Sequence, residues 1–163
     1  MSTFTIHPGS GGTLQALERN IGFIPNLAAA IAASPAALRG FVGLQTALRS
    51  STLSGLEREV VGVTVSSFND CAYSIAAHST FARKQGGDDT LIAALASGEP
   101  LADERLQSIR AFTRALLEQR GHVTSELTPE ETLEVIAQIA YTTLANYAAD
   151  VSGAPVDAAF RDN

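Results

Sequence analysis

Apolar residues recur at helical spacing along most of the chain, in segments separated by Gly, Pro and capping residues. This pattern predicts helices over about 26–33, 34–48, 54–68, 71–85, 88–96, 102–119 and 128–148. Residues 1–12 are polar and Gly-rich, and they predict a flexible lead-in. The tail contains Gly153 and Pro155, and we expect it either to dock on the helices or to fray.

The segment that follows Ser54 also fits a strand. Its run of β-branched residues, Val60 to Val65, is typical of strands. A capping box precedes the run, because Ser54 is followed three residues later by Glu57. No second strand pattern occurs with which the run could pair. The segment is therefore predicted to be a helix, and the fold class is predicted to be all-α.

Composition supports this fold class. Trp is absent and apolar residues make up 45% of the chain, so the core must consist of Ala, Leu, Val and Ile. Ala is the strongest helix former among them. At 163 residues the chain is expected to form one domain over 1–163. Only 17% of the residues are charged, which suggests that more than one helix face is covered, inside the fold or by a partner subunit.

Charge and cysteine content narrow the function classes. The net charge is −6 and no Lys/Arg cluster occurs, which argues against nucleic-acid binding. No apolar run approaches the ~20 residues of a membrane span, and the N-terminus has no signal-peptide pattern. A single cysteine cannot form an intrachain disulfide, which fits a reducing compartment. We therefore expect a cytoplasmic protein without membrane contact.

An acidic residue interrupts the apolar face of the helix that follows Ser54. Glu59 lies within the stripe formed by Leu56, Val60 and Val63, where a carboxylate is costly unless it is paired. Glu59 has either a functional partner or a position at the edge of the stripe, from which it reaches water or a surface Arg. Periodicity alone leaves both interpretations open.

The next helix carries Cys71, Ser74 and His78 on one face, with Asn69-Asp70 as its expected N-cap. Ser74 and His78 can touch, whereas Cys71 and His78 lie about 10 Å apart along the helix axis. The helix N-terminus favours a thiolate, so Cys71 is expected to have a lowered pKa. Each residue also has a structural explanation. A lone Cys is commonly a buried apolar residue, and a Ser–His pair is commonly a hydrogen bond within a helix.

The three histidines are scattered without ligand spacing, which argues against a metal site. His7 lies in the lead-in and His122 follows Gly121 in a predicted loop, so both are expected at the surface. No cofactor is expected.

Glu59, Cys71, Ser74 and His78 together resemble a known motif. In the alkylhydroperoxidase D-like (AhpD-like) branch of the carboxymuconolactone decarboxylase superfamily, a Glu is followed twelve residues later by Cys-x-x-Cys, and a His follows the second Cys by four residues. The resemblance extends over about residues 22–160. The further matching stretches are Gly22–Asn26, Ser34-Pro35, Leu53–Glu59 and Asn146-Tyr147.

The resemblance implies an AhpD-like bundle of six to eight helices that associates through apolar surfaces into trimers or hexamers. It also implies that Cys71 is the resolving position and that His78 and Glu59 form a proton relay. Ser74 stands where the family has the cysteine that attacks a peroxide. Serine oxygen has no sulfenate-like state, and one cysteine cannot close the disulfide. The two-cysteine cycle is therefore excluded.

Three functions remain open. The first is a peroxidase-type thiol oxidoreductase with an antioxidant role, in which Cys71 alone is oxidised and an external thiol reduces it. The second is a non-catalytic oligomeric scaffold. The third is a cofactor-free lyase like the decarboxylase branch, in which His78 and Glu59 move protons on a small substrate and Ser74 donates a hydrogen bond. The expected partners are further copies of the chain and a small-molecule substrate or thiol reductant.

Overall fold

Most helices of the fold begin at a polar side chain that caps them. The computed structural model describes residues 3–161, which contain eight α-helices, two short 3₁₀ turns and no strand, so the predicted all-α class is confirmed. The caps that accept a hydrogen bond from the backbone N–H three residues on are Ser34, Ser54, Asp88, Asp103 and Thr128. The helices are α1 (Gly11–Ile21), α2 (Asn26–Ile31), α3 (Pro35–Leu48), α4 (Gly55–Phe68), α5 (Ala72–Lys84), α6 (Asp89–Ser97), α7 (Glu104–Glu118) and α8 (Pro129–Ser152).

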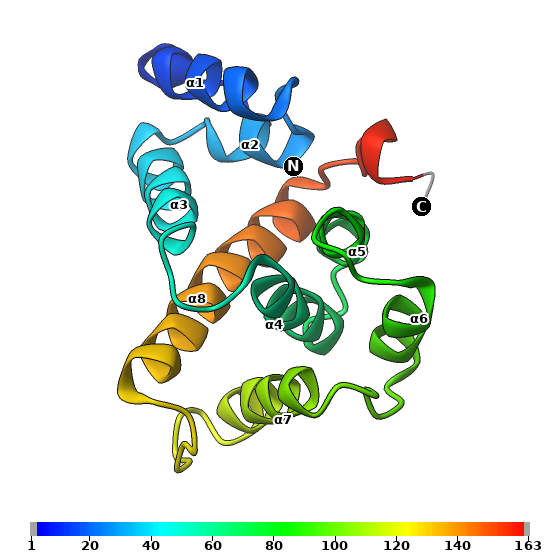
Figure 1. The fold of residues 1–163 in the computed structure, drawn as a ribbon. Coiled ribbons are helices and arrows are strands. Elements are labelled where there is room, and N and C mark those ends of the chain that lie inside the picture. Colours follow the sequence, from blue (N-terminus) through cyan, green and yellow to red (C-terminus); the bar gives the residue numbers. More distant parts are fainter. Residues whose placement is uncertain (1–2, 162–163) are drawn as a thin grey trace.

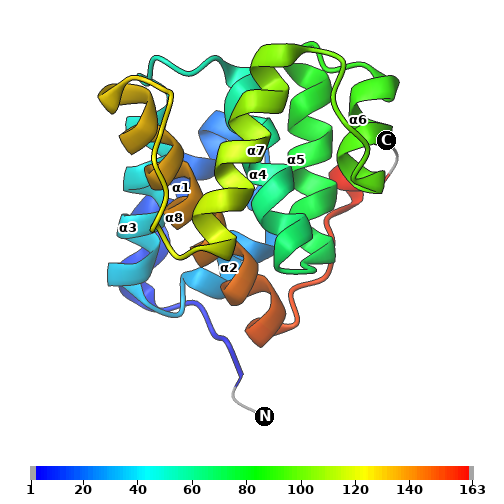
Figure 2. The same ribbon diagram turned by 90° about the horizontal axis from the view of Figure 1, so that it is seen from below.

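Helix α4 occupies the centre of the bundle, with α5, α7 and α8 packed around it (Figures 1 and 2). Val61 and Val65 pack on one side of α4 against α7 and α8, and Val60 and Val63 pack on another side against α6 and α7. Burial on several sides explains why the apolar pattern of α4 is a continuous run rather than a stripe. The run is therefore a central helix and not a strand.

The N-terminal segment differs from the prediction. A 3₁₀ turn at Pro8–Ser10 leads directly into α1, so the prediction of a flexible lead-in over residues 1–12 is wrong for residues 8–12. Ser10 is buried, and its hydroxyl donates to the Ala32 carbonyl. Leu14 and Leu17 of α1 are buried in the core. The glycines beside Pro8 suggested flexibility, but this contact to Ala32 orders them. Residues 1–2 lie outside the described residues.

The C-terminal segment docks on the bundle rather than frays. Asp157 is buried and accepts hydrogen bonds from the Tyr73 hydroxyl (2.5 Å) and from the backbone N–H of Asn26. Phe160 packs edge-on against Tyr73 and Phe81 of α5. The segment therefore lies beside α5, as Figure 1 shows. Within residues 3–161, no helix is long and apolar enough to cross a membrane.

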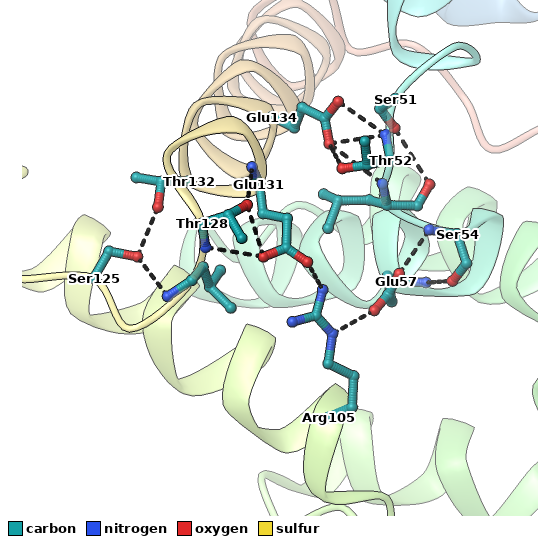
Figure 3. Close-up of polar contacts among 12 residues, drawn as sticks. Ser51, Thr52, Ser54, Glu57, Arg105, Ser125, Thr128, Glu131, Thr132 and Glu134 are labelled. Atoms are coloured by element: carbon teal, nitrogen blue, oxygen red, sulfur yellow. Dashed lines mark hydrogen bonds and ion pairs between the residues drawn. The ribbon is translucent and has the colours of Figure 1, made fainter.

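Arg105 of α7 joins the starts of α4 and α8 (Figure 3). Each of these helices begins with a capping box, in which the glutamate at the third helical position is Glu57 in α4 and Glu131 in α8. The Arg105 guanidinium donates to both carboxylates, at 2.7 and 2.5 Å. These bonds lower the pKa of Glu57 although burial opposes the shift, and they add to the backbone bond from Thr128 that lowers the pKa of Glu131. One cation thus fixes two helix starts relative to a third helix.

Replacing Arg105 with Gln should lower the free energy of unfolding by about 1 kcal/mol, because a networked but partly exposed ion pair contributes on that scale. Urea unfolding at pH 7 measures this. Since the pKa values of both glutamates are lowered in the fold, their contribution is present at neutral pH and is lost as the pH falls through the lowered values. The difference between the variant and the native chain should shrink accordingly in acid. A difference that persists after the glutamates are protonated would contradict the assignment.

Candidate functional site

Glu59 of α4 and His78 of α5 form the centre of the candidate site. His78 Nδ1 lies 2.6 Å from Glu59 Oε2, and the two side chains are 8% and 18% exposed. A carboxylate accepts hydrogen bonds, so Nδ1 carries the hydrogen and Nε2 is left for another partner. Of the two interpretations of Glu59, the one with a specific partner fits, because its carboxylate pairs with His78 rather than with a surface Arg.

Gly62 allows α4 to approach the His78 ring. A Cβ atom at position 62 would lie 2.4 Å from Nδ1 and 2.6 Å from Cε1 of that ring, closer than packed atoms can approach. The missing side chain is therefore what makes room for the imidazole beside Glu59, which lies three residues earlier on α4. Sequence reasoning did not single out Gly62, although a glycine inside a helix commonly has a packing reason.

Gly62→Ala should displace His78 from Glu59 and reduce any reaction that depends on the pair by about 10²-fold, since a shift of about 1 Å at a catalytic group can cost that much. The fold should remain, because Ala is a better helix former than Gly. Turnover and the imidazole NMR signals of His78 measure the effect. The matched control is Gly40→Ala on α3, where no heavy atom lies within 4 Å of the added methyl. Equal activity in both variants would refute the packing argument.

Cys71 precedes α5 rather than lying in its first turn. It is the N-cap residue, so the expected Asn69-Asp70 cap is wrong: Asn69 ends α4, and Asp70 adopts a positive φ of 54° in the turn. The Cys71 side chain is fully buried. Burial raises the pKa of its thiol, and the nearby Asp150 carboxylate adds to the shift, against the hydrogen bonds from Ser74. The expected lowered pKa is therefore wrong, because desolvation outweighs the helix N-terminus.

Ser74 contacts Cys71 and lines the same cavity as His78. The Cys71 sulfur lies 3.6 Å from Ser74 Oγ and 3.7 Å from the Asn146 carbonyl oxygen. Ser74 is 2% exposed, and it lines a cavity that His78 also lines. The structure thus brings all four predicted residues together as two contacting pairs, Glu59–His78 and Cys71–Ser74, and one residue of each pair, His78 and Ser74, lines the same cavity.

His78 lines two neighbouring spaces. The inner cavity has a volume of about 50 Å³ and a mainly apolar wall that includes Phe41, Phe81 and Phe160. The outer cleft is larger, at about 580 Å³, and more polar. His78, Gln45 and Tyr141 line both spaces. Cys71 lines neither, so a ligand in these spaces meets Ser74 and His78 and not the thiol.

Tyr141 and Gln45 belong to the site, although the sequence did not indicate them. The Gln45 amide donates to the Tyr141 hydroxyl at 3.2 Å, which leaves the phenol hydrogen available to a ligand. Burial raises the pKa of Tyr141, and the Glu59 carboxylate adds to this, so the phenol remains a hydrogen donor. The sequence signal for Tyr141 is its spacing from Gln138. The two polar residues lie three positions apart on α8, so they share its inward side.

The other two histidines lie apart from this site. His7 is exposed and accepts a hydrogen bond from the Gly9 backbone, and His122 is exposed in the loop after α7. Within residues 3–161, no group of three or more His, Cys, Asp or Glu side chains is arranged to hold a metal ion. Tyr73 lines the inner cavity, but its hydroxyl donates to Asp157 rather than toward His78.

Solved structures of other proteins share the fold of this chain. An AhpD-core, peroxidase-related protein from Ralstonia eutropha JMP134 superposes with a TM-score of 0.82 at 20% identity, over 98% of this chain and 96% of that one. A peroxidase-related protein from Silicibacter sp. TM1040 gives 0.81 at 22% identity, over 97% and 90%. A variant of the debrominase Bmp8 in complex with 2,3,4-tribromopyrrole gives 0.80 at 19% identity, over 99% and 95%. These likenesses show a shared fold.

The family comparison covers the site itself. The carboxymuconolactone decarboxylase family model matches residues 35–115, a range that includes Glu59, Cys71, Ser74 and His78. No curated protein matches the chain significantly. The chain belongs to the carboxymuconolactone decarboxylase superfamily and has the AhpD-like fold.

Proposed function

We propose that the chain is a cofactor-free lyase that decarboxylates a small carboxylated lactone or a related acid. The observation that carries the proposal is the Glu59–His78 pair, at 2.6 Å, at the junction of the outer cleft and the inner cavity. Glu59 orients the imidazole through Nδ1, and Nε2 is the nitrogen that exchanges a proton with substrate. The carboxylate also faces the imidazolium that forms when Nε2 is protonated.

The walls of the two spaces fit a substrate with an anionic end and an apolar body. Arg49, Arg58 and Lys84 line the outer cleft, and Glu59 is the one acidic residue among its lining residues. This excess of cations favours entry of a carboxylate. The apolar wall of the inner cavity favours an uncharged group there. Decarboxylation converts the bound carboxylate into neutral CO2, and the proton added to the ring carbon neutralises the negative charge that remains on the substrate.

The reaction balances without an oxidant. The bond between the carboxylate carbon and the ring breaks, CO2 leaves, and the electron pair remains on the ring carbon and spreads onto the lactone carbonyl oxygen. Protonated His78 then delivers a proton from Nε2 to that carbon and regains a proton from water in the cleft. The hydroxyl groups of Ser74 and Tyr141 can donate to the carbonyl oxygen on which negative charge develops, which stabilises the transition state.

The direct test is incubation with carboxymuconolactone, the compound in the family name, with CO2 release as the readout. We expect turnover by the native chain and a strong decrease in Glu59→Gln, which keeps the shape of Glu59 but loses its charge. Arg39→Gln, an exposed change on α3, should retain full activity. Absence of turnover above the buffer rate would reject this substrate class, and a scaffold role would then account for the fold.

Thiol oxidation is a second candidate function, which requires local opening around Cys71, because its buried sulfur lies 3.6 Å from Ser74 behind the wall of the inner cavity. A peroxide would transfer one oxygen to the sulfur, forming a sulfenate and an alcohol, and an external thiol would reduce the sulfenate. Because the pKa of Cys71 is raised, its reactivity toward peroxide should increase only above the pH at which an ordinary cysteine forms its thiolate. Dimedone trapping followed by intact mass measurement over a pH series tests this, with Cys71→Ala as the blank.

We also propose that the chain forms a trimer or hexamer. An exposed apolar stripe runs along α8, and its large members Leu133, Ile136, Tyr147 and Val151 are 43–76% exposed. Such a stripe on a single helix is typical of a subunit interface. Light scattering should give a mass of three or six chains, and Leu133→Glu should dissociate the assembly. Ser50→Glu, an exposed change in a loop, is the control. A native chain that is monomeric at micromolar concentration would refute the proposal.

A further inference from the structure

Arg110 of α7 is a buried cation without a carboxylate partner among the described residues. The residue is 6% exposed, although arginine is rarely buried without a paired acid. One of its N–H groups donates to the Glu99 carbonyl at 2.5 Å, just beyond the C-terminus of α6. Burial lowers the pKa of its guanidinium, and the Arg114 charge adds to this. A charge in this position is costly unless an anion compensates it.

The unused donors of Arg110 face open space rather than packed protein. An arginine has five N–H groups, and the Glu99 carbonyl accepts from only one guanidinium nitrogen. Within the described residues, no fully buried side-chain nitrogen or oxygen lacks a hydrogen-bond partner. The guanidinium nitrogens of Arg110 that have no partner are therefore accessible to solvent. The two spaces that Arg110 lines are the places from which solvent or a ligand reaches them.

One of these spaces has the chemistry of an anion site. It has a volume of about 360 Å³ and lies between the C-terminal ends of α4 and α6 and one face of α7. Arg110 and Arg114 both line it, one helical turn apart, and no acidic side chain does. Its hydroxyl groups belong to Thr64, Ser67 and Ser97. Arg114 also pairs with Glu118, but that pair is about half exposed and Glu118 does not line this space.

An apolar surface adjoins the two cations. Phe68, the last residue of α4, lines the same space and is 47% exposed, so part of its apolar side chain is open to a ligand. Exposed apolar surface beside a polar cluster is typical of a ligand site. The space is separate from the Glu59–His78 site, since the two share no lining residue.

We propose that this space, the Arg110 pocket (Thr64, Ser67, Phe68, Ser97, Arg110 and Arg114), binds a small aromatic or similarly apolar molecule that carries a carboxylate or phosphate group. The oxyanion accepts hydrogen bonds from the two guanidinium groups, which present paired donors that match a planar carboxylate or a phosphate. The apolar part of the ligand lies on Phe68. The anion thus compensates the buried charge that the fold leaves unpaired.

NMR titration of the native chain tests the proposal, followed at the Nε–Hε signals of its arginines. Benzoate and phenyl phosphate are the two probes, and the tighter one identifies the anionic group. Benzamide, which has nearly the shape of benzoate without its charge, is the matched control. We expect a saturable shift of the Arg110 signal with at least one anion and none with benzamide. Equal shifts with benzoate and benzamide, or no shift with either anion, would overturn the proposal.

A variant locates the binding. Arg114 is the residue to change because it is exposed and makes no contact inside the core. Arg114→Gln should weaken binding about tenfold, since loss of one hydrogen bond to a charged group has an effect of that size. Arg39→Gln removes the same charge from an exposed position on α3 and should bind as the native chain does. Equal affinity in the two variants would overturn the assignment to this pocket.

Discussion

Replacing His78 with Gln should lower kcat/KM for decarboxylation by about 10²–10⁴-fold, the range that a positioned acid–base group contributes. Gln retains a hydrogen-bond donor toward Glu59 and much of the volume of His, but it cannot hold and release a proton near neutral pH. His78 is 6% exposed between α4 and α5, so the replacement also keeps the helices packed. CO2 release measures the effect, and circular dichroism measures the fold.

His122→Gln is the matched control for this experiment. His122 is exposed in the loop after α7 and lines neither space of the candidate site. The control should retain native kcat and KM. If His78→Gln also retained native kcat, the relay would have no catalytic role, and the fold would be a scaffold whose buried polar pair contributes stability alone.

Replacing Ser74 with Cys should give the chain a two-cysteine, disulfide-forming cycle of peroxide reduction, which a single cysteine excludes in the native chain. The Cys71 sulfur lies 3.6 Å from Ser74 Oγ, so two sulfur atoms at these positions could reach the ~2.05 Å of a disulfide after a small side-chain rotation. A thiol at position 74 would also face the cavity that His78 lines. Consumption of a hydroperoxide in the presence of dithiothreitol measures the gain.

Two further variants make this result interpretable. Ser74→Ala removes the hydroxyl without adding sulfur, and it should not gain the peroxide reduction of Ser74→Cys. The double variant Ser74→Cys/His78→Gln keeps both thiols but loses the relay, and it should be much slower than Ser74→Cys alone. Equal rates in the single and double variants would show that His78 does not serve position 74. A protein in which no disulfide forms would refute the inferred geometry.

The sequence predicted the helices well because local signals determine them. Ser54 and Thr128 each carry a capping box, and both boxes form. Prediction was less successful where a distant contact decides the outcome. The segment around Ser10 is ordered by Ala32, 22 residues away, and the tail is ordered by the Asp157–Tyr73 bond, which spans 84 residues. No local pattern contains that information.

The candidate site also combines residues that local patterns indicated with features that only distant contacts decide. Helical spacing placed Ser74 and His78 on one face, periodicity singled out Glu59, and the resemblance paired Glu59 with His78, which it contacts. The environment of Cys71 was predicted wrongly, because a helix N-terminus is visible in a sequence whereas burial between α5 and α8 is not. Tyr141 and Gln45 come from other helices and complete the cavity only in the folded chain. The unpaired charge of Arg110 was hidden for the same reason.

Gly62 determines how easily such a site can be lost in evolution. Codons for Gly and Ala differ by a single base, so one mutation can place a methyl group against the His78 ring. The same mutation improves the helix propensity of α4 by roughly 0.5–1 kcal/mol, which offsets part of the cost of displacing the ring. A copy of the gene released from selection for catalysis could thus lose the Glu59–His78 pair in one step and keep its fold.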